Sequence, residues 1–218
     1  MNRSNTPGWL AAYEKIRTDG YAMLAALLTQ PPSAVLLKML GSLEWEDALP
    51  GKLGAALDAL RRAGPGHEPG ELEQEYHRLF VGLGRGEMVP YSSWYREGKM
   101  MSLPLVSLRS ALRRFGIVKR EERGDSEDHA GALCEVMTLL SAEPDGASRA
   151  EQREFFRRHI ATWMPAFFKD LRSAQGAGFY RAVGVFGGSF LETEGDYFRY
   201  GAGNELPAAE GGGGRDET

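Results

Sequence analysis

The histidines and carboxylates of this sequence are the residues that could hold a metal ion. Their spacing can be compared with the spacing that known metal sites need. A di-iron carboxylate bundle needs Glu-x-x-His pairs on facing helices. Here Glu73 precedes His77 by four residues and Glu154 precedes His159 by five, so this spacing is absent. Zinc needs three or four converging ligands, which 4 scattered histidines and 1 cysteine do not supply. The sequence therefore predicts no metal site and no cofactor.

Nucleophilic catalysis is the second chemistry that the residue types allow, because it needs a Ser or Cys beside a His and an orienting group. Ser92, Ser93 and His129 could meet in space, yet neither serine lies in a nucleophile elbow. The glycine-rich segment 82–86 follows a helical pattern and lacks a Lys-Ser/Thr pair, so it does not match a phosphate-binding loop. We predict that the chain is not an enzyme. The alternative is a small helical enzyme with a pocket near His129 and Tyr91.

Composition restricts the class of protein further. The formal net charge of −4 argues against general nucleic-acid binding, which needs a basic surface. The basic run from Arg109 to Arg120 is interpreted as a solvated helix face, because Glu121 and Glu122 follow it. The single cysteine, Cys134, excludes an internal disulfide, and its apolar neighbours predict burial. No apolar run reaches the roughly 20 residues that cross a bilayer, so we expect a soluble, cytoplasmic protein without membrane insertion.

Helical periodicity runs through most of the chain, and no strand-type alternation lasts beyond a few residues. A first helix is predicted with Thr6 as its cap and Pro7 at its first position, ending before Pro31. A later helix should begin near Asp125 or Ser126 and break near residue 144. The other predicted helices cover residues 33–40, 49–63, 72–80 with an end at Gly82, 103–115, 150–174 and 179–200.

These elements predict an all-α protein with a single helical bundle over residues 1–203. The aromatic stripe from Phe156 to Leu171 is interpreted as core, and Pro165 should kink its helix. The glycines at 184, 187 and 188 indicate close helix contact. Residues 204–218 contain few apolar side chains and many glycines, so we expect a disordered tail there.

Three short motifs in a fixed order are the most informative part of the sequence. The first is Glu75-Tyr76-x-x-Leu79-Phe80, followed by Gly82. The second is the loop of residues 90–95, Pro-Tyr-Ser-Ser-Trp-Tyr, and the third is the pair Asp128-His129 before an apolar helix. Together, on a helical framework, they resemble the TorD/DmsD-type chaperones that mature molybdenum enzymes. The resemblance extends over about residues 8 to 200.

Two details modify this resemblance. Many members of the family carry a Glu where Ser92 stands, and often a Glu-Pro pair where residues 125–127 stand. The sequence of residues 127–137 and 179–184 is most similar to that of relatives associated with formate dehydrogenase-type enzymes.

The resemblance implies a cytoplasmic chaperone, monomeric or homodimeric, that binds the cofactor-free catalytic subunit of a molybdenum or tungsten oxidoreductase. Binding would use the N-terminal segment of that client, such as a twin-arginine signal peptide, until the molybdopterin cofactor is inserted. Recognition needs an apolar groove with carboxylates for the arginines, and Glu73, Glu75, Glu127 and Asp128 are available. The predicted client-binding residues are Tyr91, Ser93, Trp94, Tyr95, Glu127, Asp128 and His129.

Structural roles for the same residues stay open on the sequence alone. Asp128 in a first helical turn would favour the helix dipole without any ligand, and His129 could be a core histidine. Tyr91 and Tyr95 could lock the loop onto the bundle. An adaptor that binds a helix, without any part in cofactor insertion, is a further alternative to the chaperone.

Overall fold

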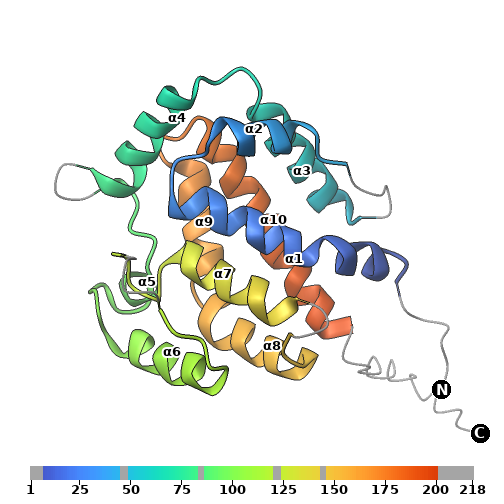
Figure 1. The fold of residues 1–218 in the computed structure, drawn as a ribbon, viewed down its shortest axis with the longest axis vertical. Helices are drawn as coiled ribbons and strands as arrows, with labels where there is room; N and C mark the ends of the chain where they lie inside the picture. The colour runs from blue at the N-terminus through green and yellow to red at the C-terminus, as the bar shows by residue number, and fades with distance from the viewer. Residues whose placement is uncertain (1–6, 45–48, 83–85, 120–123, 143–145, 201–218) are drawn as a thin grey trace, which may run out of the picture.

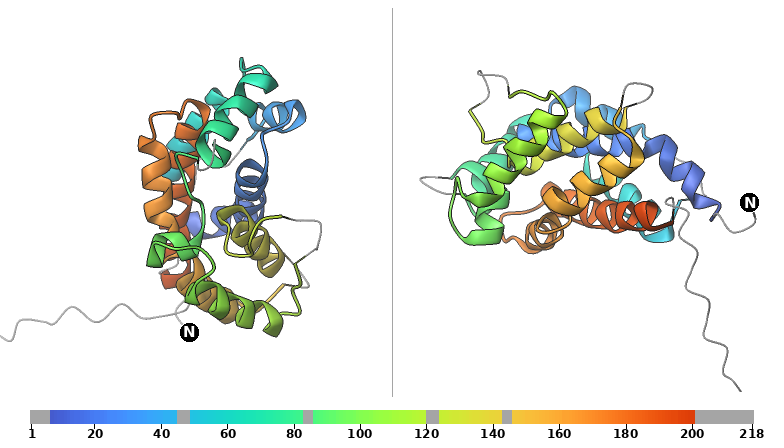
Figure 2. Two further views of the ribbon diagram at one scale, coloured as in Figure 1. Left: turned by 90° about the vertical axis from the view of Figure 1, so that its left-hand side faces the viewer. Right: turned by 90° about the horizontal axis from the view of Figure 1, so that it is seen from below.

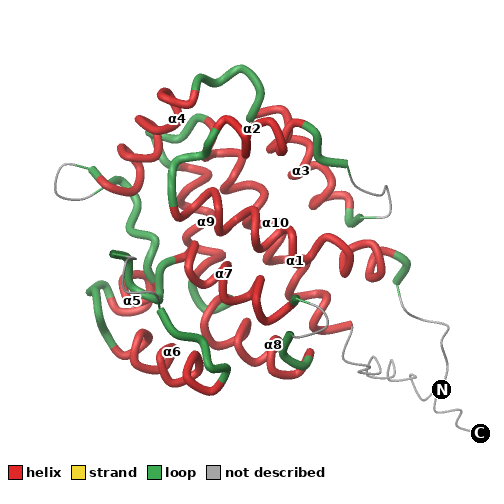
Figure 3. The backbone as a smooth tube through the Cα atoms, in the orientation of Figure 1, coloured by secondary structure: helices red, strands yellow, loops and turns green. Residues whose placement is uncertain are grey.

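The computed structural model describes residues 7–44, 49–82, 86–119, 124–142 and 146–200, and the regular structure within these ranges is helical. Figure 3 shows helices joined by loops, without a strand in the described part of the chain. The all-α prediction is confirmed. The elements are α1 (Trp9–Thr29), α2 (Ala34–Gly41), α3 (Gly51–Ala63), α4 (Pro69–Tyr76), η1 (His77–Val81), α5 (Ser92–Glu97), α6 (Leu103–Arg114), α7 (Ala130–Ser141), α8 (Arg149–Phe155), η2 (Phe156–Ile160), α9 (Met164–Ser173) and α10 (Phe179–Tyr200).

The helices form two main layers. In one layer α1 and α7 pack along each other, and in the other α10 packs between α9 and α3 (Figures 1 and 2). Helices α6 and α8 lie together at one end of the molecule, beyond α7 and α9 (Figure 1). Aromatic side chains fill the space between the layers, because rings bury a large apolar area. The fully buried ones are Tyr13, Tyr21, Phe167, Phe168, Phe179, Tyr180, Phe186 and Phe190.

The predicted helix of residues 150–174 is wrong as a single element. It is divided into α8, the π-helical turn η2 and α9, with a break at Trp163, whose φ of −151° leaves the helical region. Pro165 lies in the first turn of α9, where its missing N–H costs no hydrogen bond. It therefore follows a helix break instead of kinking a continuous helix. The aromatic stripe is nevertheless buried as predicted.

Three other boundaries differ from the predictions. Helix α1 begins at Trp9 with Gly8 as its cap, and Thr6 lies outside the described residues. Helix α7 begins at Ala130, later than the predicted start at Asp125 or Ser126. A short helix, α5, follows the 82–91 loop where no helix was predicted. The helix that carries the first motif, α4 continued by η1, ends at Gly82 as predicted, and the φ of this glycine is 60°.

Close contact between α9 and α10 is confirmed at two of the three glycines. A β-carbon on Gly187 would lie 2.2 Å from a ring carbon of Phe168, and one on Gly184 would lie 2.7 Å from the backbone nitrogen of Arg172. Gly188 faces open space. Glycines at 184 and 187 therefore let the two helices approach, as small residues do at tight packing contacts.

A buried ion pair connects α1 to α10. The Arg17 guanidinium donates hydrogen bonds of 2.6–2.9 Å to both oxygens of Glu194, and its Nη1 donates to Gln152 of α8 at 2.6 Å. Tyr13 and Tyr21 donate to the same carboxylate at 2.8 and 2.9 Å. Burial, with Glu194 nearby, raises the pKa of both phenols, so both hydroxyls keep their protons. The charge of Glu194 is thus fully hydrogen-bonded inside the protein.

No helix in the described ranges is both long and apolar enough to span a membrane. The predicted tail of residues 204–218, and the last residues of the predicted 1–203 domain, lie outside the described residues.

Candidate functional site

The second and third sequence motifs meet in space. Tyr91 and His129 form an isolated antiparallel bridge, and two backbone hydrogen bonds flank it. Ser92 N–H donates to the Asp128 carbonyl at 3.0 Å, and Ala130 N–H donates to the Pro90 carbonyl at 2.8 Å. The loop that leads into α5 is thereby fixed to the start of α7. Two segments that are 35 or more positions apart in the sequence therefore form one site.

Asp128 positions the beginning of α5 through a side-chain hydrogen bond. Its Oδ2 accepts a 2.8 Å hydrogen bond from the backbone N–H of Ser93, and both residues are fully buried. Its Oδ1 has no hydrogen-bond partner among the described residues. Asp128 lies before the helix cap of α7, so the prediction that it stands in the first helical turn is wrong. The cap is His129, whose Nδ1 accepts from Gly131 N–H at 3.1 Å.

This geometry gives Asp128 a positioning role with a measurable signature. Asp128→Ala leaves a buried N–H without its acceptor, so we expect a loss of stability of about 1–3 kcal/mol. Asp128→Asn keeps an oxygen acceptor and should lose less. Thermal unfolding and client titration on both variants test this. A variant Asp128→Asn that unfolds normally yet loses client affinity would contradict the positioning role and favour direct pairing with a client cation.

The aromatic residues of the loop remain partly accessible. Tyr91 packs edge-on against His129, with ring centroids 5.0 Å apart, and its hydroxyl donates to Asp125 at 2.8 Å. Tyr95 packs against Trp163 at 5.5 Å and donates to Asp170 Oδ2 at 3.0 Å. Tyr91, Trp94 and Tyr95 are each half-buried. These three aromatic side chains therefore reach the surface, whereas Ser93, Asp128 and His129 lie beneath it.

Glu127 is the remaining predicted client-binding residue, and a cation of the same chain already pairs with it. Arg109 of α6 donates from Nε and Nη2 to its two oxygens at 2.8 and 2.9 Å. This pairing lowers the pKa of Glu127. The ion pair also attaches α6 to the segment before α7.

A cleft of about 350 Å³ opens beside the aromatic loop. Trp94 and Tyr95 line it, and so do two acidic residues that the sequence analysis missed, Glu87 and Asp170. Asp170 Oδ1 makes no hydrogen bond with any described residue, while Oδ2 accepts from Tyr95. The remaining walls are Met88, Val89, Ser173 and Ala174. We call this the Trp94 cleft, and its aromatic and carboxylate groups can together hold a cationic side chain.

Glu87 contributes charge to this cleft from a fixed position. Its two carboxylate oxygens accept hydrogen bonds from the backbone N–H groups of Gln175 and Gly176, at 2.7 and 2.9 Å. These hydrogen bonds connect the loop after α9 to the segment before α5 that contains Glu87. Asp170, by contrast, is exposed on α9. Nothing in its local sequence marks it, because only the fold brings it beside Tyr95.

A family model described as "Nitrate reductase delta subunit" matches residues 46–169, which include all three motifs. The chain belongs to this family. The predicted resemblance to the TorD-type chaperones is confirmed by named relatives as well. The chaperone protein TorD of Vibrio cholerae serotype O1 is 25% identical over 134 residues, 57% of this chain and 60% of the relative. TorD of a second strain is 23% identical over 172 residues, 74% of this chain and 78% of the relative.

TorD of Aliivibrio salmonicida is also 25% identical, over 62% of its length. The chain thus spans about three fifths of the first two curated relatives that it matches. A crystal structure from Archaeoglobus fulgidus, described as that of a redox enzyme maturation protein, has a TM-score of 0.54 at 17% identity. It covers 81% of this chain and 94% of the other. This similarity shows that the TorD-family chain shares an all-helical fold with that protein.

In this TorD-family chain the first motif has a structural use that the sequence analysis missed. Glu75 was predicted to be available for a client cation, but its carboxylate is buried. It accepts hydrogen bonds from the backbone N–H groups of Gly178, Phe179 and Tyr180 at 2.8, 3.1 and 2.8 Å. It therefore caps the N-terminus of α10. Glu73, two residues earlier, is exposed.

The alternative of an enzyme receives no support from the family or from the geometry. The relatives named above are chaperones. His129 and Tyr91 do not line the Trp94 cleft, the cleft between α6 and α8 or the cleft beside Arg17. No group of three His, Cys, Asp or Glu side chains in the described ranges could hold a metal ion. Cys134 is buried as predicted, and burial raises its pKa, so its thiol is not activated.

Proposed function

We propose that the chain is a cytoplasmic chaperone for the cofactor-free catalytic subunit of a molybdopterin oxidoreductase, of the formate dehydrogenase or DMSO reductase type. It holds the N-terminal segment of that client, such as a twin-arginine signal peptide, while the cofactor is inserted. Family membership and the relatives named TorD support the chaperone role. The observation that supports binding of a cationic segment is the Trp94 cleft, where carboxylates lie beside half-buried aromatic rings.

The proposed surface uses the predicted residues in two ways. Tyr91, Trp94 and Tyr95 contact the client, because they are the members that reach the surface. Ser93, Asp128 and His129 keep them in place through the buried hydrogen bonds described above. Glu127 lies at the edge of this surface, paired with Arg109. Asp170 supplies an accessible carboxylate oxygen for a guanidinium or ammonium group.

Removal of this carboxylate should weaken client binding. We expect Asp170→Asn to lower the affinity for an arginine-containing N-terminal peptide of the cognate oxidoreductase by about tenfold or more, because a charge-assisted hydrogen bond contributes about 1.5–3 kcal/mol. Trp94→Ala should lower it by a similar factor through lost stacking. Fluorescence anisotropy or calorimetry on the purified full chain measures both. Asp58→Asn on α3 is the matched control, because it removes the same charge outside this surface.

The maturation role needs a second comparison. A chaperone that acts before cofactor insertion should bind the cofactor-free catalytic subunit at least about tenfold more tightly than the loaded enzyme, since only a difference in affinity can select one state. Equal affinity for the two forms would overturn the maturation role. Stable capture of the loaded enzyme alone would favour the adaptor alternative.

A further inference from the structure

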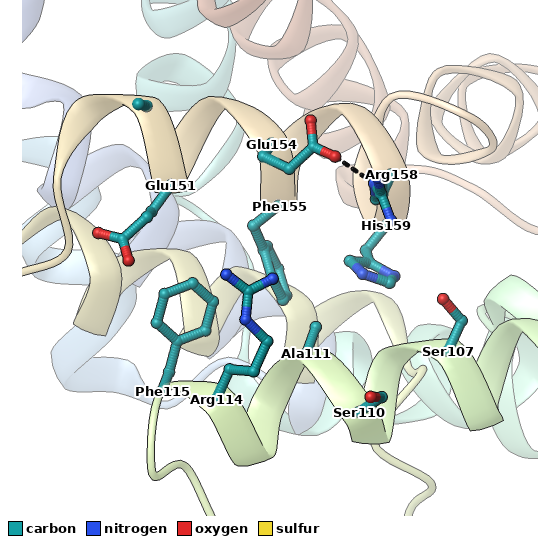
Figure 4. Close-up of a pocket in the computed structure, with 11 residues that line it drawn as sticks. Ser107, Ser110, Ala111, Arg114, Phe115, Glu151, Glu154, Phe155, Arg158 and His159 are labelled. Carbon is teal, nitrogen blue, oxygen red and sulfur yellow. Dashed lines mark ion pairs between the residues drawn. The ribbon is translucent and has the colours of Figure 1, made fainter.

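A second cleft, of about 340 Å³, lies between α6 and α8 and shares no lining residue with the cleft described above. Phe115 and Phe155 form an aromatic wall in it, with ring centroids 6.2 Å apart. Figure 4 shows Arg114 reaching from α6 toward Phe155, and His159 pointing from η2 toward α6, with Ser107 facing it. We call this the α6–α8 cleft.

His159 is a buried polar side chain that points into this cleft without a partner. The residue is 4% exposed, and neither ring nitrogen makes a hydrogen bond with a residue that the structure describes. Burial, with the positive charges of Arg96 and Arg158 nearby, lowers the pKa of His159 to about 4, so its ring is neutral at pH 7. A neutral imidazole has one N–H donor and one acceptor nitrogen. Since buried polar groups normally have partners, a ligand that both donates and accepts would complete this site.

The backbone that carries His159 is a π-helical turn. Ala161 N–H donates to the carbonyl of Phe156, five residues back, at 2.9 Å, so this turn is wider than an α-helical one. Such turns within helices are frequent at functional sites. Across the cleft, Ser107 and Ser110 of α6 are both exposed and three positions apart, so their hydroxyls lie on one side of the helix. Both walls of the cleft therefore present groups that can form hydrogen bonds to a ligand.

The charges around the cleft are balanced. Two arginines and two glutamates line it, at positions 114, 158, 151 and 154, and Arg158 pairs with Glu154. This balance favours a neutral ligand over an anion or a cation. The aromatic wall favours a ring, and the polar end needs a group that both donates and accepts. A phenol meets both requirements, whereas an indole N–H can only donate.

We propose that the α6–α8 cleft binds the side chain of a tyrosine on a partner chain. The ring packs against the aromatic wall, and the hydroxyl donates to the unprotonated nitrogen of His159 and accepts from Ser107 or Ser110. Arg114 makes no hydrogen bond or ion pair with any described residue, so its guanidinium can donate to a backbone carbonyl beside the tyrosine. Tyrosine is a common anchor at protein interfaces, because a large ring carries one polar tip. This site is separate from the proposed client surface at the Trp94 cleft.

N-acetyl-tyrosinamide is the probe for this site. Calorimetry or NMR titration of the purified full chain compares it with N-acetyl-phenylalaninamide, which lacks only the hydroxyl. We expect the tyrosine amide to bind about tenfold more tightly, because the hydroxyl completes the hydrogen bonds of the polar end. His159→Phe keeps a ring but removes both nitrogens, so it should reduce this preference to about threefold or less.

A double variant, Ser107→Ala with Ser110→Ala, changes only exposed positions and should fold normally. It should lower the preference for the tyrosine amide by roughly threefold. The matched control is Ser42→Ala, an exposed serine after α2 that lies outside this cleft, and it should keep the full preference. No detectable binding of the tyrosine amide, or equal affinity for the two amides, would overturn the proposal. An unchanged preference in the double variant would overturn it too.

A third compound, 4-methylphenol, separates a tyrosine of a partner chain from a free phenol. It has the ring and the hydroxyl without the peptide groups that Arg114 can bind. The tyrosine amide should bind several times more tightly than 4-methylphenol, and Arg114→Gln should reduce this advantage. If 4-methylphenol binds as tightly as the tyrosine amide, the assignment to a partner chain is wrong and the ligand is a small free phenol.

Discussion

Replacing Arg17 by alanine should lower the free energy of unfolding by about 3–5 kcal/mol, the cost of leaving a buried charge without its partner. Glu194 is fully buried, and Arg17 is its only cationic partner among the described residues. Tyr13 and Tyr21 would continue to donate to the carboxylate, but hydroxyl groups cannot neutralise its charge. The Nη1 bond to Gln152, which joins α8 to this pair, would be lost as well.

Thermal unfolding and denaturant titration measure this effect. A loss of that size corresponds to a decrease in Tm of roughly 6–20 °C for a domain of this length. The matched control is Lys52→Ala, which removes the ion pair with Glu192 on the surface, where both side chains are more than half exposed. It should change stability by less than about 1 kcal/mol. A change below about 1 kcal/mol for Arg17→Ala would mean that Glu194 is protonated or that water enters beside it.

Arg17 of this ion pair also lines another cleft, of about 540 Å³, at the junction of α1, α7, α8 and α10. Arg17, Thr18 and Gln152 line it, together with Tyr197. Tyr197 donates to Glu14 at 2.8 Å and lies under the Arg17 guanidinium at 4.7 Å. These polar side chains of the cleft therefore interact with one another. Its interactions join helices that are distant in the sequence, which is a structural role.

Helix faces could be predicted from the sequence because burial imposes a period on apolar residues. The predicted core positions Leu133, Val136 and Leu140 are buried on α7, and Tyr76 and Leu79 are buried in the motif helix. Helix ends were less predictable. Ser126 and Asp125 are good capping residue types, but residues 127–128 form a turn, and the bridge to Tyr91 keeps the backbone of His129 extended, so α7 begins at Ala130. Tertiary contact therefore decides where α7 begins.

The candidate site was predicted in part. The motif order identified the loop and the start of α7, and the structure joins them. The burial of His129 was one of the alternatives that the sequence left open. The burial of Asp128 and Ser93 could not be predicted, because it depends on α5, whose six residues carry no clear periodicity. Asp170 was missed since its only link to the site is a contact across 75 positions of sequence.

Glu75→Ala should destabilise the protein by about 3 kcal/mol or more, because it removes the shared acceptor of three backbone N–H groups at the start of α10. Two of these, on Phe179 and Tyr180, are buried and have no access to water as a substitute. The carboxylate charge also favours the positive end of this 22-residue helix. Glu75→Gln keeps an oxygen acceptor without the charge, so its loss should be smaller, about 1–2 kcal/mol.

Glu73→Ala is the control for this series, since Glu73 lies on the same helix, is exposed, and was predicted as an equivalent carboxylate. It should leave stability within about 0.5 kcal/mol of the parent. Client affinity, measured below the unfolding temperature of each variant, separates capping from recognition. If Glu75 only caps α10, folded Glu75→Gln binds the client normally while its Tm falls. A variant Glu75→Gln with an unchanged Tm and at least tenfold weaker client binding would contradict the capping role, and would mean that α4 opens to expose this carboxylate when a client binds.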